Sequence, residues 1–176
     1  MAGDPGAPAA DGGGIGGDAL ARIQIVEVRT PAELEQAFAI RRAVFVDEQG
    51  VDEALEFDGR DDHARHLLAL KHGEAVGTLR VRWADGRHIA KIERVAVSPG
   101  ARGARVGHAL LRAAVALAEA EGAEEARLHA QVAARSFYVK LGFVAFGPEF
   151  IEDGIPHIAM RLSLRTQAAG HRRRLQ

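Results

Sequence analysis

A glycine-rich turn lies between residues 92 and 111 and has the composition of a phosphate-binding loop. Up to Val97 the apolar residues alternate as in a buried strand, and from about Val106 they recur with the period of a helix. The residues that permit a tight turn between these elements are Pro99, Gly100, Gly103 and Gly107. Because the first amides of a helix lack partners within it and the helix dipole favours anions, this turn predicts a phosphate site.

The same loop resembles a family motif. The run Arg102-Gly103-Ala104-Arg105-Val106-Gly107 is similar to the pyrophosphate loop of the GNAT N-acetyltransferases, which reads Arg or Gln, two free positions, Gly, one free position, then Gly or Ala. One position departs from the pattern, because Arg105 stands where the family usually has Gly. The charge of Arg105 could assist in holding the phosphates.

Other segments resemble the ElaA-like branch of this family. They are Phe45-Val46-Asp47-Glu48-Gln49, Arg65-His66-Leu67 and Gly154-Ile155-Pro156-His157. The resemblance extends from about Ile23 to Leu164 and implies acetyl-CoA as the acyl donor. It also implies an α/β (α+β) fold of the GNAT type, with a mixed, mostly antiparallel central sheet and helices on both faces. In that fold two central strands splay apart to form a slot for pantetheine, which here would lie between residues 93–97 and 128–132.

The resemblance assigns the cofactor-binding residues. The backbone of Val95, Ala96 and Val97 would bond the pantetheine arm. The amides that would hold the pyrophosphate belong to Arg102, Gly103, Ala104, Arg105, Val106, Gly107 and His108. A side chain at Gly107 would stand between the start of the helix and the phosphate, so this glycine is the member that the loop most requires.

A downstream segment supplies an acid. Residues 131–138 are similar to the family pattern Asn-x-x-Ala-x-x-Phe-Tyr, with Gln131 in place of Asn and Ala134 matched. By this resemblance Gln131 and Ala134 lie beside the cofactor, Tyr138 lies at the CoA sulfur, and Phe137 belongs to the core. A phenol with a pKa of about 10 is protonated at pH 7, so Tyr138 is the predicted general acid for the departing thiolate.

The general base has several candidates. Glu93 is the carboxylate nearest the slot, and regular alternation would place it on the same strand face as Val95 and Val97. Family members place a base on this strand, some of them two residues earlier, where this chain has Lys91. A glutamate in a strand is otherwise an ion-pair partner of a neighbouring arginine, and the sequence leaves that alternative open.

Two histidines are rivals for the same role. His66 and His157 lie in the ElaA-like segments and are predicted to approach the acceptor substrate, where an imidazole could act as base near neutral pH. A histidine near a strand end is also often structural. Among the eight histidines only the pair His63-x-x-His66 has close spacing, and it lacks helical context, so no metal site is predicted.

The signals for secondary structure agree with the fold that the resemblance implies. A strand is predicted over residues 22–29, followed by a helix that begins with the capping box of Thr30 and Glu33 and runs to about Val44. An acidic loop over residues 47–62, with a short helix at 52–55, could hold a cationic amine. Later strands are expected at 66–71, 75–83, up to 97, 127–132, 143–147 and 157–163, and helices at 106–121 and 134–141.

The composition indicates one domain, over residues 20–164, in the cytoplasm. A net charge of −1 provides no general field for nucleic acid or an anionic membrane, and the absence of cysteine excludes disulfides, thiolate zinc sites and a cysteine nucleophile. No apolar run approaches the ~20 residues that span a bilayer. Residues 1–19 are rich in Gly and Pro and are predicted to be disordered, and residues 165–176 are predicted to be a basic tail.

Three functions follow from these patterns. The first is an acetyl-CoA-dependent N-acetyltransferase, a monomer or homodimer, that moves an acetyl group to a primary amine of a small molecule or peptide by direct attack in a ternary complex. The alternative is a non-catalytic acyl-CoA-binding regulatory module. The third, binding of nucleic acid or a partner through Arg172-Arg173-Arg174, predicts salt-sensitive binding that does not depend on Gly107.

Overall fold

The computed structural model describes residues 22–103 and 105–164. The predictions for residues 1–19, Ala104 and residues 165–176 concern parts of the chain outside these ranges. The strands are β1 Gln24–Glu27, β2 Arg65–Lys71, β3 Glu74–Ala84, β4 Ile89–Val97, β5 Glu125–Gln131, β6 Val144–Ala145, β7 Phe150–Glu152 and β8 Ile155–Ser163. The helices are α1 Pro31–Arg41, α2 Glu53–Glu56, α3 Val106–Ala120 and α4 Arg135–Lys140.

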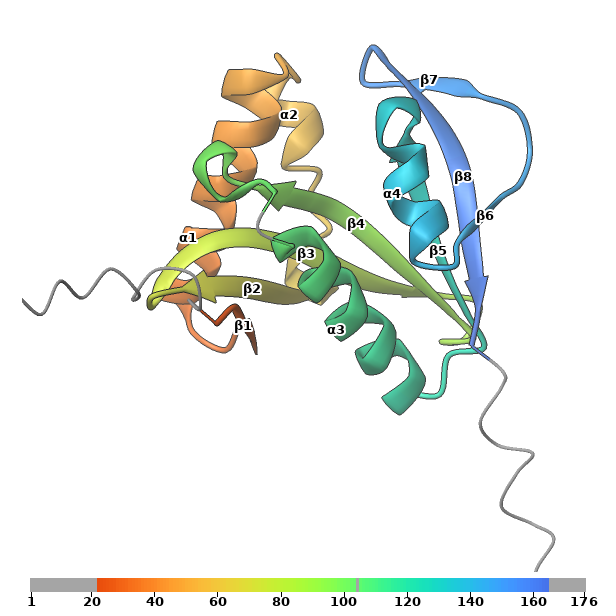
Figure 1. Cartoon of the computed structure of the whole chain (residues 1–176), viewed down its shortest axis with the longest axis horizontal. Helices are drawn as coiled ribbons and strands as arrows, with labels where there is room; N and C mark the ends of the chain where they lie inside the picture. The colour runs from red at the N-terminus through yellow and green to blue at the C-terminus, as the bar shows by residue number, and fades with distance from the viewer. Residues whose placement is uncertain (1–21, 104, 165–176) are drawn as a thin grey trace, which may run out of the picture.

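Within the described ranges the strands form a single mixed sheet in the order β1-β2-β3-β4-β5-β8-β6, with β7 paired to β8. The β4–β5 pair is parallel and the other pairs are antiparallel. The sheet has two arms, β1–β4 and β5–β8, which meet along a short stretch of β4 and β5 and then diverge (Figure 1). The predicted fold class, a mostly antiparallel mixed sheet, is confirmed.

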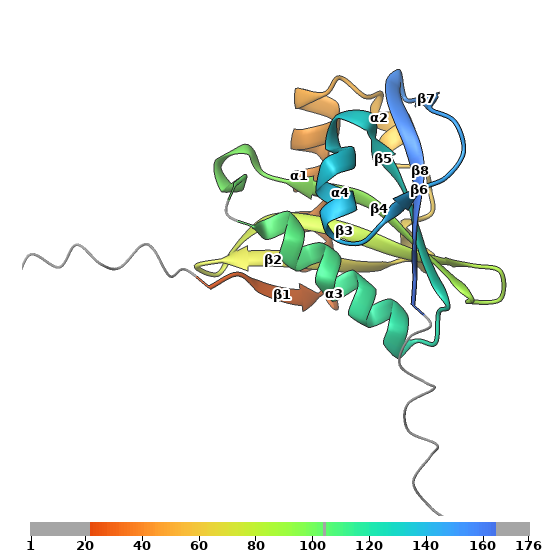
Figure 2. The same ribbon diagram turned by 45° about the vertical axis from the view of Figure 1, so that its right-hand side comes forward.

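Helices cover both faces of the sheet (Figure 2). On one face α1 buries Ala37 and Ile40 against Leu68 and Ala96 of the sheet. On the other face α3 and α4 pack with the apolar residues of β3, β4 and β5 in the larger core. The helix α3 approaches β3 closely at Gly77, where a Cβ would lie 2.9 Å from Cγ1 of Val106. This close approach fixes the start of α3 beside the end of β4.

The first helix begins as its capping signal predicts, but its regular α-helical part ends at Arg41, before the predicted end at Val44. The Thr30 side chain accepts a bond from the amide of Glu33, and the Glu33 side chain accepts from the amide of Thr30. After Arg41 the chain continues as a π-helical segment, Arg42–Glu48, rather than stopping at Val44. Since π-helical turns often occur at functional sites, this irregular end is notable for lying beside the cavity described below.

The C-terminal strands differ from the sequence-based prediction. The strand predicted at 143–147 is reduced to Val144–Ala145, and β7 was not predicted. β7 and β8 form a hairpin whose two-residue turn, Asp153-Gly154, has positive φ at both positions, 51° and 76°. An Asp-Gly pair is a strong signal for such a turn, so the sequence did contain the information for this hairpin.

Among the described residues, no helix has the length and apolar character needed to cross a membrane.

Candidate active site

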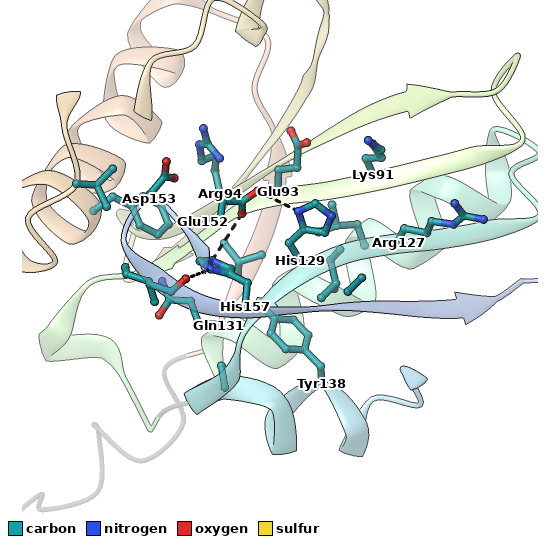
Figure 3. Close-up of a pocket in the computed structure, with 18 of the residues that line it drawn as sticks. Lys91, Glu93, Arg94, Arg127, His129, Gln131, Tyr138, Glu152, Asp153 and His157 are labelled. Carbon is teal, nitrogen blue, oxygen red and sulfur yellow. Dashed lines mark hydrogen bonds and ion pairs between the residues drawn. The ribbon is translucent and has the colours of Figure 1, made fainter. Parts of the chain in front are cut away.

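A cavity of about 390 Å³ opens where β4 and β5 separate. The two strands pair only at Ile89–Glu125, Ala90–Ala126 and Lys91–Arg127, and beyond this point residues of β4 and β5 no longer face each other in the ladder. Both strands, the end of the π-helical segment, α4 and the β7–β8 hairpin contribute to its lining (Figure 3). The slot that was predicted between residues 93–97 and 128–132 is therefore present, with unpaired strand edges on both sides.

A bulge in β4 changes which residues face the cavity. The register with β3 shifts between Thr78–Ala96 and Arg80–Glu93, and Arg94 has a φ of 58°. The extra residue turns Glu93 toward the face covered by α1, while Val95 and Val97 pack against the core under α3. The expectation that Glu93 shares a face with these two valines was wrong, because it assumed regular alternation through the strand.

Glu93 lines the cavity, but two arginines hold its carboxylate. Arg82 donates to both oxygens at 2.7 Å, and Nε of Arg80 donates to Oε2 at 2.9 Å. Burial raises the pKa of the Glu93 carboxyl, but the hydrogen bond from Arg82 and the charges of Arg80 and Arg82 outweigh it and hold the pKa below its ordinary value. A carboxylate in this state accepts a proton poorly.

The acidic loop between α1 and β2 is neutralised in the same way. Arg80, which is 1% exposed, also bonds Asp58 at 2.7 Å and Asp61 at 2.9 Å. Arg41, also 1% exposed, bonds Asp61 and Glu56. These carboxylates are thus already paired with arginines, which removes the reason to assign them to a cationic amine.

Tyr138 lies on α4 at the opposite side of the slot from Glu93. Its ring packs edge-on against Phe137 and Phe143, and it lines the cavity with 8% of its surface exposed. Burial raises the pKa of Tyr138 to about 12. The phenol is therefore protonated across the neutral pH range, the state that a general acid requires.

Gln131 and Ala134 line the same cavity at the end of β5 and the turn before α4. The side-chain amide of Gln131 donates to Oε1 of Gln49 at 2.8 Å, although the two residues are 82 positions apart. Gln49 belongs to one of the ElaA-like segments, but nothing in its local sequence marks it as a partner of Gln131. This bond links the π-helical segment to the far arm of the sheet.

His157 lies in the cavity with a defined orientation. Its Nδ1 is 2.7 Å from the carbonyl oxygen of Ile155, which can only accept, so Nδ1 carries a hydrogen and Nε2 is the ring nitrogen left for other partners. Glu152 places one oxygen 3.7 Å from this Nε2 and the other 3.1 Å from Nδ1 of His129 (Figure 3). Sequence patterns did not single out Glu152, because β7, which carries it, was not predicted. His129 lies in the strand predicted at 127–132, but it belongs to no motif that was recognised there.

His66 does not line the cavity. It is 5% exposed, its Nε2 lies 3.0 Å from the backbone oxygen of Asp61, and it packs edge-on against Phe38. Burial lowers its pKa. This environment fits the structural alternative that the sequence left open for a histidine near a strand end.

The predicted pyrophosphate loop joins β4 to α3 through a short helical turn at Pro99–Ala101. Arg102 donates to Glu48 and to the carbonyl of Val97, which ties the loop to the π-helical segment. Arg105 is the residue before α3; it has a left-handed conformation (φ 63°), and its side chain makes no capping bond. Glycine adopts this left-handed conformation without strain, which explains why the family usually has Gly at this position. The first amides of α3, which no side chain caps, suit an anion.

Three further loop residues pack at the start of α3. Val106 is buried in the core, and His108 lies edge-on to the ring of Phe137. A Cβ on Gly107 would lie 3.2 Å from Cζ of Phe137, so this glycine also allows α3 and α4 to pack closely. A substitution at Gly107 would therefore disturb packing as well as the predicted phosphate site.

Comparisons with known proteins agree with this geometry. Residues 28–164 match the Acetyltransferase (GNAT) domain, so the chain belongs to the GNAT acetyltransferase family. It is similar to ElaA of Escherichia coli, with 30% identity and a TM-score of 0.72 over 80% of this chain and 99% of that one. These findings confirm the resemblance drawn from the sequence.

Two other similar proteins carry names of the same kind. An acyl-CoA N-acyltransferase of Pseudomonas aeruginosa is 33% identical, with a TM-score of 0.70 over 80% of this chain and 99% of that one. A Bacillus subtilis protein named as an acetyltransferase, BSU40680, is 36% identical over 141 residues, 78% of this chain and 95% of its own length.

Among the described residues, no group of three His, Cys, Asp or Glu side chains could hold a metal ion.

Proposed function

We propose that the protein is an acetyl-CoA-dependent N-acetyltransferase that acts on a primary amine by direct attack. The observation that carries this proposal is the separation of β4 from β5. It opens a cavity that Tyr138 lines, and β4 leads from it to the start of α3, where no side chain caps the first amides. The free edge of β4 at Val95–Val97 suits an extended pantetheine arm, and the amides from Arg102 to His108, among those described, suit a diphosphate.

In the proposed reaction the amine nitrogen attacks the acetyl carbonyl carbon, so that a C–N bond forms and the C–S bond breaks. A proton leaves the amine for a base on the α1 face of the slot, and the departing thiolate takes the phenolic proton of Tyr138. One side of the slot thus accepts a proton from the amine, and the other side donates a proton to the thiolate. Tyr138 and the base return to their starting states by exchange with water.

For the base we propose His157, whereas the sequence favoured Glu93. Nε2 of His157 lies 3.7 Å from Oε2 of Glu152, whose charge would stabilise a proton that the imidazole takes from the amine. Glu93 is held by two arginines that oppose protonation. We propose that Glu93 instead orients Arg82 and Arg80 beside the cavity.

The function is tested by thiol release from acetyl-CoA with a panel of amino acids, polyamines, aminoglycosides and peptides. Saturable release with at least one amine, and a product of the mass of the acetylated amine, is the expected result. Tight acetyl-CoA binding without release for any amine would favour the alternative, a non-catalytic acyl-CoA-binding module.

A pH profile decides between the two bases. His157→Gln should lower kcat by about 10²-fold near neutral pH and recover at higher pH, since a basic solution supplies the free amine without help. His129→Gln, which removes the histidine whose Nδ1 lies 3.1 Å from Glu152, is the matched control and should lose far less kcat. If Glu93→Gln shows the recovering profile and His157→Gln a flat loss, Glu93 is the base.

A charge change at the start of α3 tests the cofactor site. Arg105→Glu should weaken acetyl-CoA binding by about tenfold, because it places a negative charge beside the amides proposed for the diphosphate. Arg112→Glu makes the same change of net charge further along α3 and serves as the control in calorimetric titrations. Equal affinities in the two variants would show that the diphosphate binds elsewhere.

A further inference from the structure

A row of basic residues crosses the sheet at the closed end of the slot. The strand registers pair Arg82 with Lys91, Lys91 with Arg127, and Arg127 with Arg161, over β3, β4, β5 and β8. Neighbouring strands lie about 4.8 Å apart, so these four cations are close enough to repel one another. The row faces the cavity side, since the adjacent Ala90 and Ala126 belong to the core under α3.

Three of the four cations have partners. Arg82 is paired with Glu93 at 2.7 Å, and Arg127 is paired with Glu125. Arg127 and Arg161 also share the ring of Phe146, at 5.5 and 5.1 Å from its centroid. Lys91 makes no ion pair with any residue in the described ranges, although it lines the cavity.

The carboxylates of the cavity do not compensate for Lys91. Glu93 and Glu56 are bound by arginines, and Glu152 faces His129 and His157. Asp153 lies at the other end of the cavity from Lys91 and Arg127 (Figure 3). At the closed end of the cavity, Lys91 is therefore the cation that no carboxylate of the described residues pairs with, whereas Arg82 and Arg127 each have one.

We infer that the acceptor is a primary amine that also carries an anionic group, a carboxylate or a phosphate, which Lys91 and Arg127 bind. This inference rests on the proposed function and names the class of its substrate. Lys91 stands two residues, about 6.6 Å of strand, from Glu93. An anion held at Lys91 would leave the amine a few bonds away, near Glu93 and His157, where the acetyl group is transferred.

Matched acceptors test the inference. Thiol release is measured with ω-amino acids from glycine to 6-aminohexanoate, with the alkylamines of equal length, and with aminoalkyl phosphonates to distinguish the two anions. At least one anionic acceptor should exceed its neutral counterpart by about tenfold or more in kcat/KM. The length of the best acceptor reports the distance from the anion site to the reacting carbon.

Variants link the preference to the basic row. Lys91→Glu should reduce the ratio of kcat/KM for anionic over neutral acceptors to about one or below, mainly through KM. Arg161 belongs to the same row but does not line the cavity. Arg161→Gln should therefore keep the ratio of kcat/KM for anionic over neutral acceptors that the parent shows. Circular dichroism and melting temperatures confirm that both variants fold, and Lys91→Met replaces Lys91→Glu if the latter does not.

The outcomes separate this inference from the proposed function. Neutral amines that react as well as their anionic counterparts would overturn the inference and leave the acetyltransferase intact. An anionic preference that survives Lys91→Glu and Lys91→Met would also overturn it, because the anion would then bind elsewhere. Failure of every amine to release thiol would overturn the proposed function and the inference with it.

Discussion

Tyr138→Phe should lower kcat by about 10²- to 10⁴-fold, the range that positioned proton transfer usually contributes. That loss corresponds to roughly 3–5 kcal/mol of transition-state free energy. The substitution deletes the hydroxyl and keeps the ring, so the edge-on contacts with Phe137 and Phe143 remain. Acetyl-CoA affinity and melting temperature should therefore change little, which steady-state kinetics and calorimetry can measure together.

The pH dependence adds a second test of the same residue. Because burial raises the pKa of Tyr138 to about 12, the phenol keeps its proton through the range in which the protein can be assayed. In the parent, deprotonation of Tyr138 should thus cause no loss of kcat up to about pH 10. Normal turnover of Tyr138→Phe with a lower melting temperature would instead make Tyr138 a core residue with no catalytic role.

Arg80→Met should lower the free energy of unfolding by about 3–5 kcal/mol at pH 7, the usual cost of removing one partner from a buried ionic cluster. Arg80 is 1% exposed and bonds Asp58, Asp61 and Glu93, so its loss leaves three carboxylates facing one another with less compensation. Arg42→Met is the matched control. Its ion pair with Glu53 is exposed, and such pairs contribute about 0–1 kcal/mol.

The difference between Arg80→Met and the parent should depend on pH. The hydrogen bond from Arg80 lowers the pKa of Asp58 in the folded state, so this group stabilises the fold above its unfolded pKa of about 4. That stability is lost as the pH falls through the folded pKa. Urea unfolding should therefore show a large difference at pH 7 that shrinks below about pH 4, and a difference that is independent of pH would contradict the ionic origin.

The sequence by itself determined the elements whose signals are local. The capping box at Thr30, the helical period after Val106 and the glycine turn between β4 and α3 were predicted because neighbouring residues carry each pattern. The family resemblance added the pairing of these elements into a splayed sheet. Because the resemblance includes residues 131–138, it also predicted that Tyr138 lies near the slot.

The tertiary structure decided which side chains face the cavity. A bulge at Arg94 turns Glu93 to the α1 face, and no local pattern predicts it, because the register of β4 is set by its pairing with β3. The partners of Glu93 and Gln131 also come from other elements, Arg80 and Gln49 among them. Contacts between residues distant in sequence depend on how strands align, and alternation along one strand carries no information about that alignment.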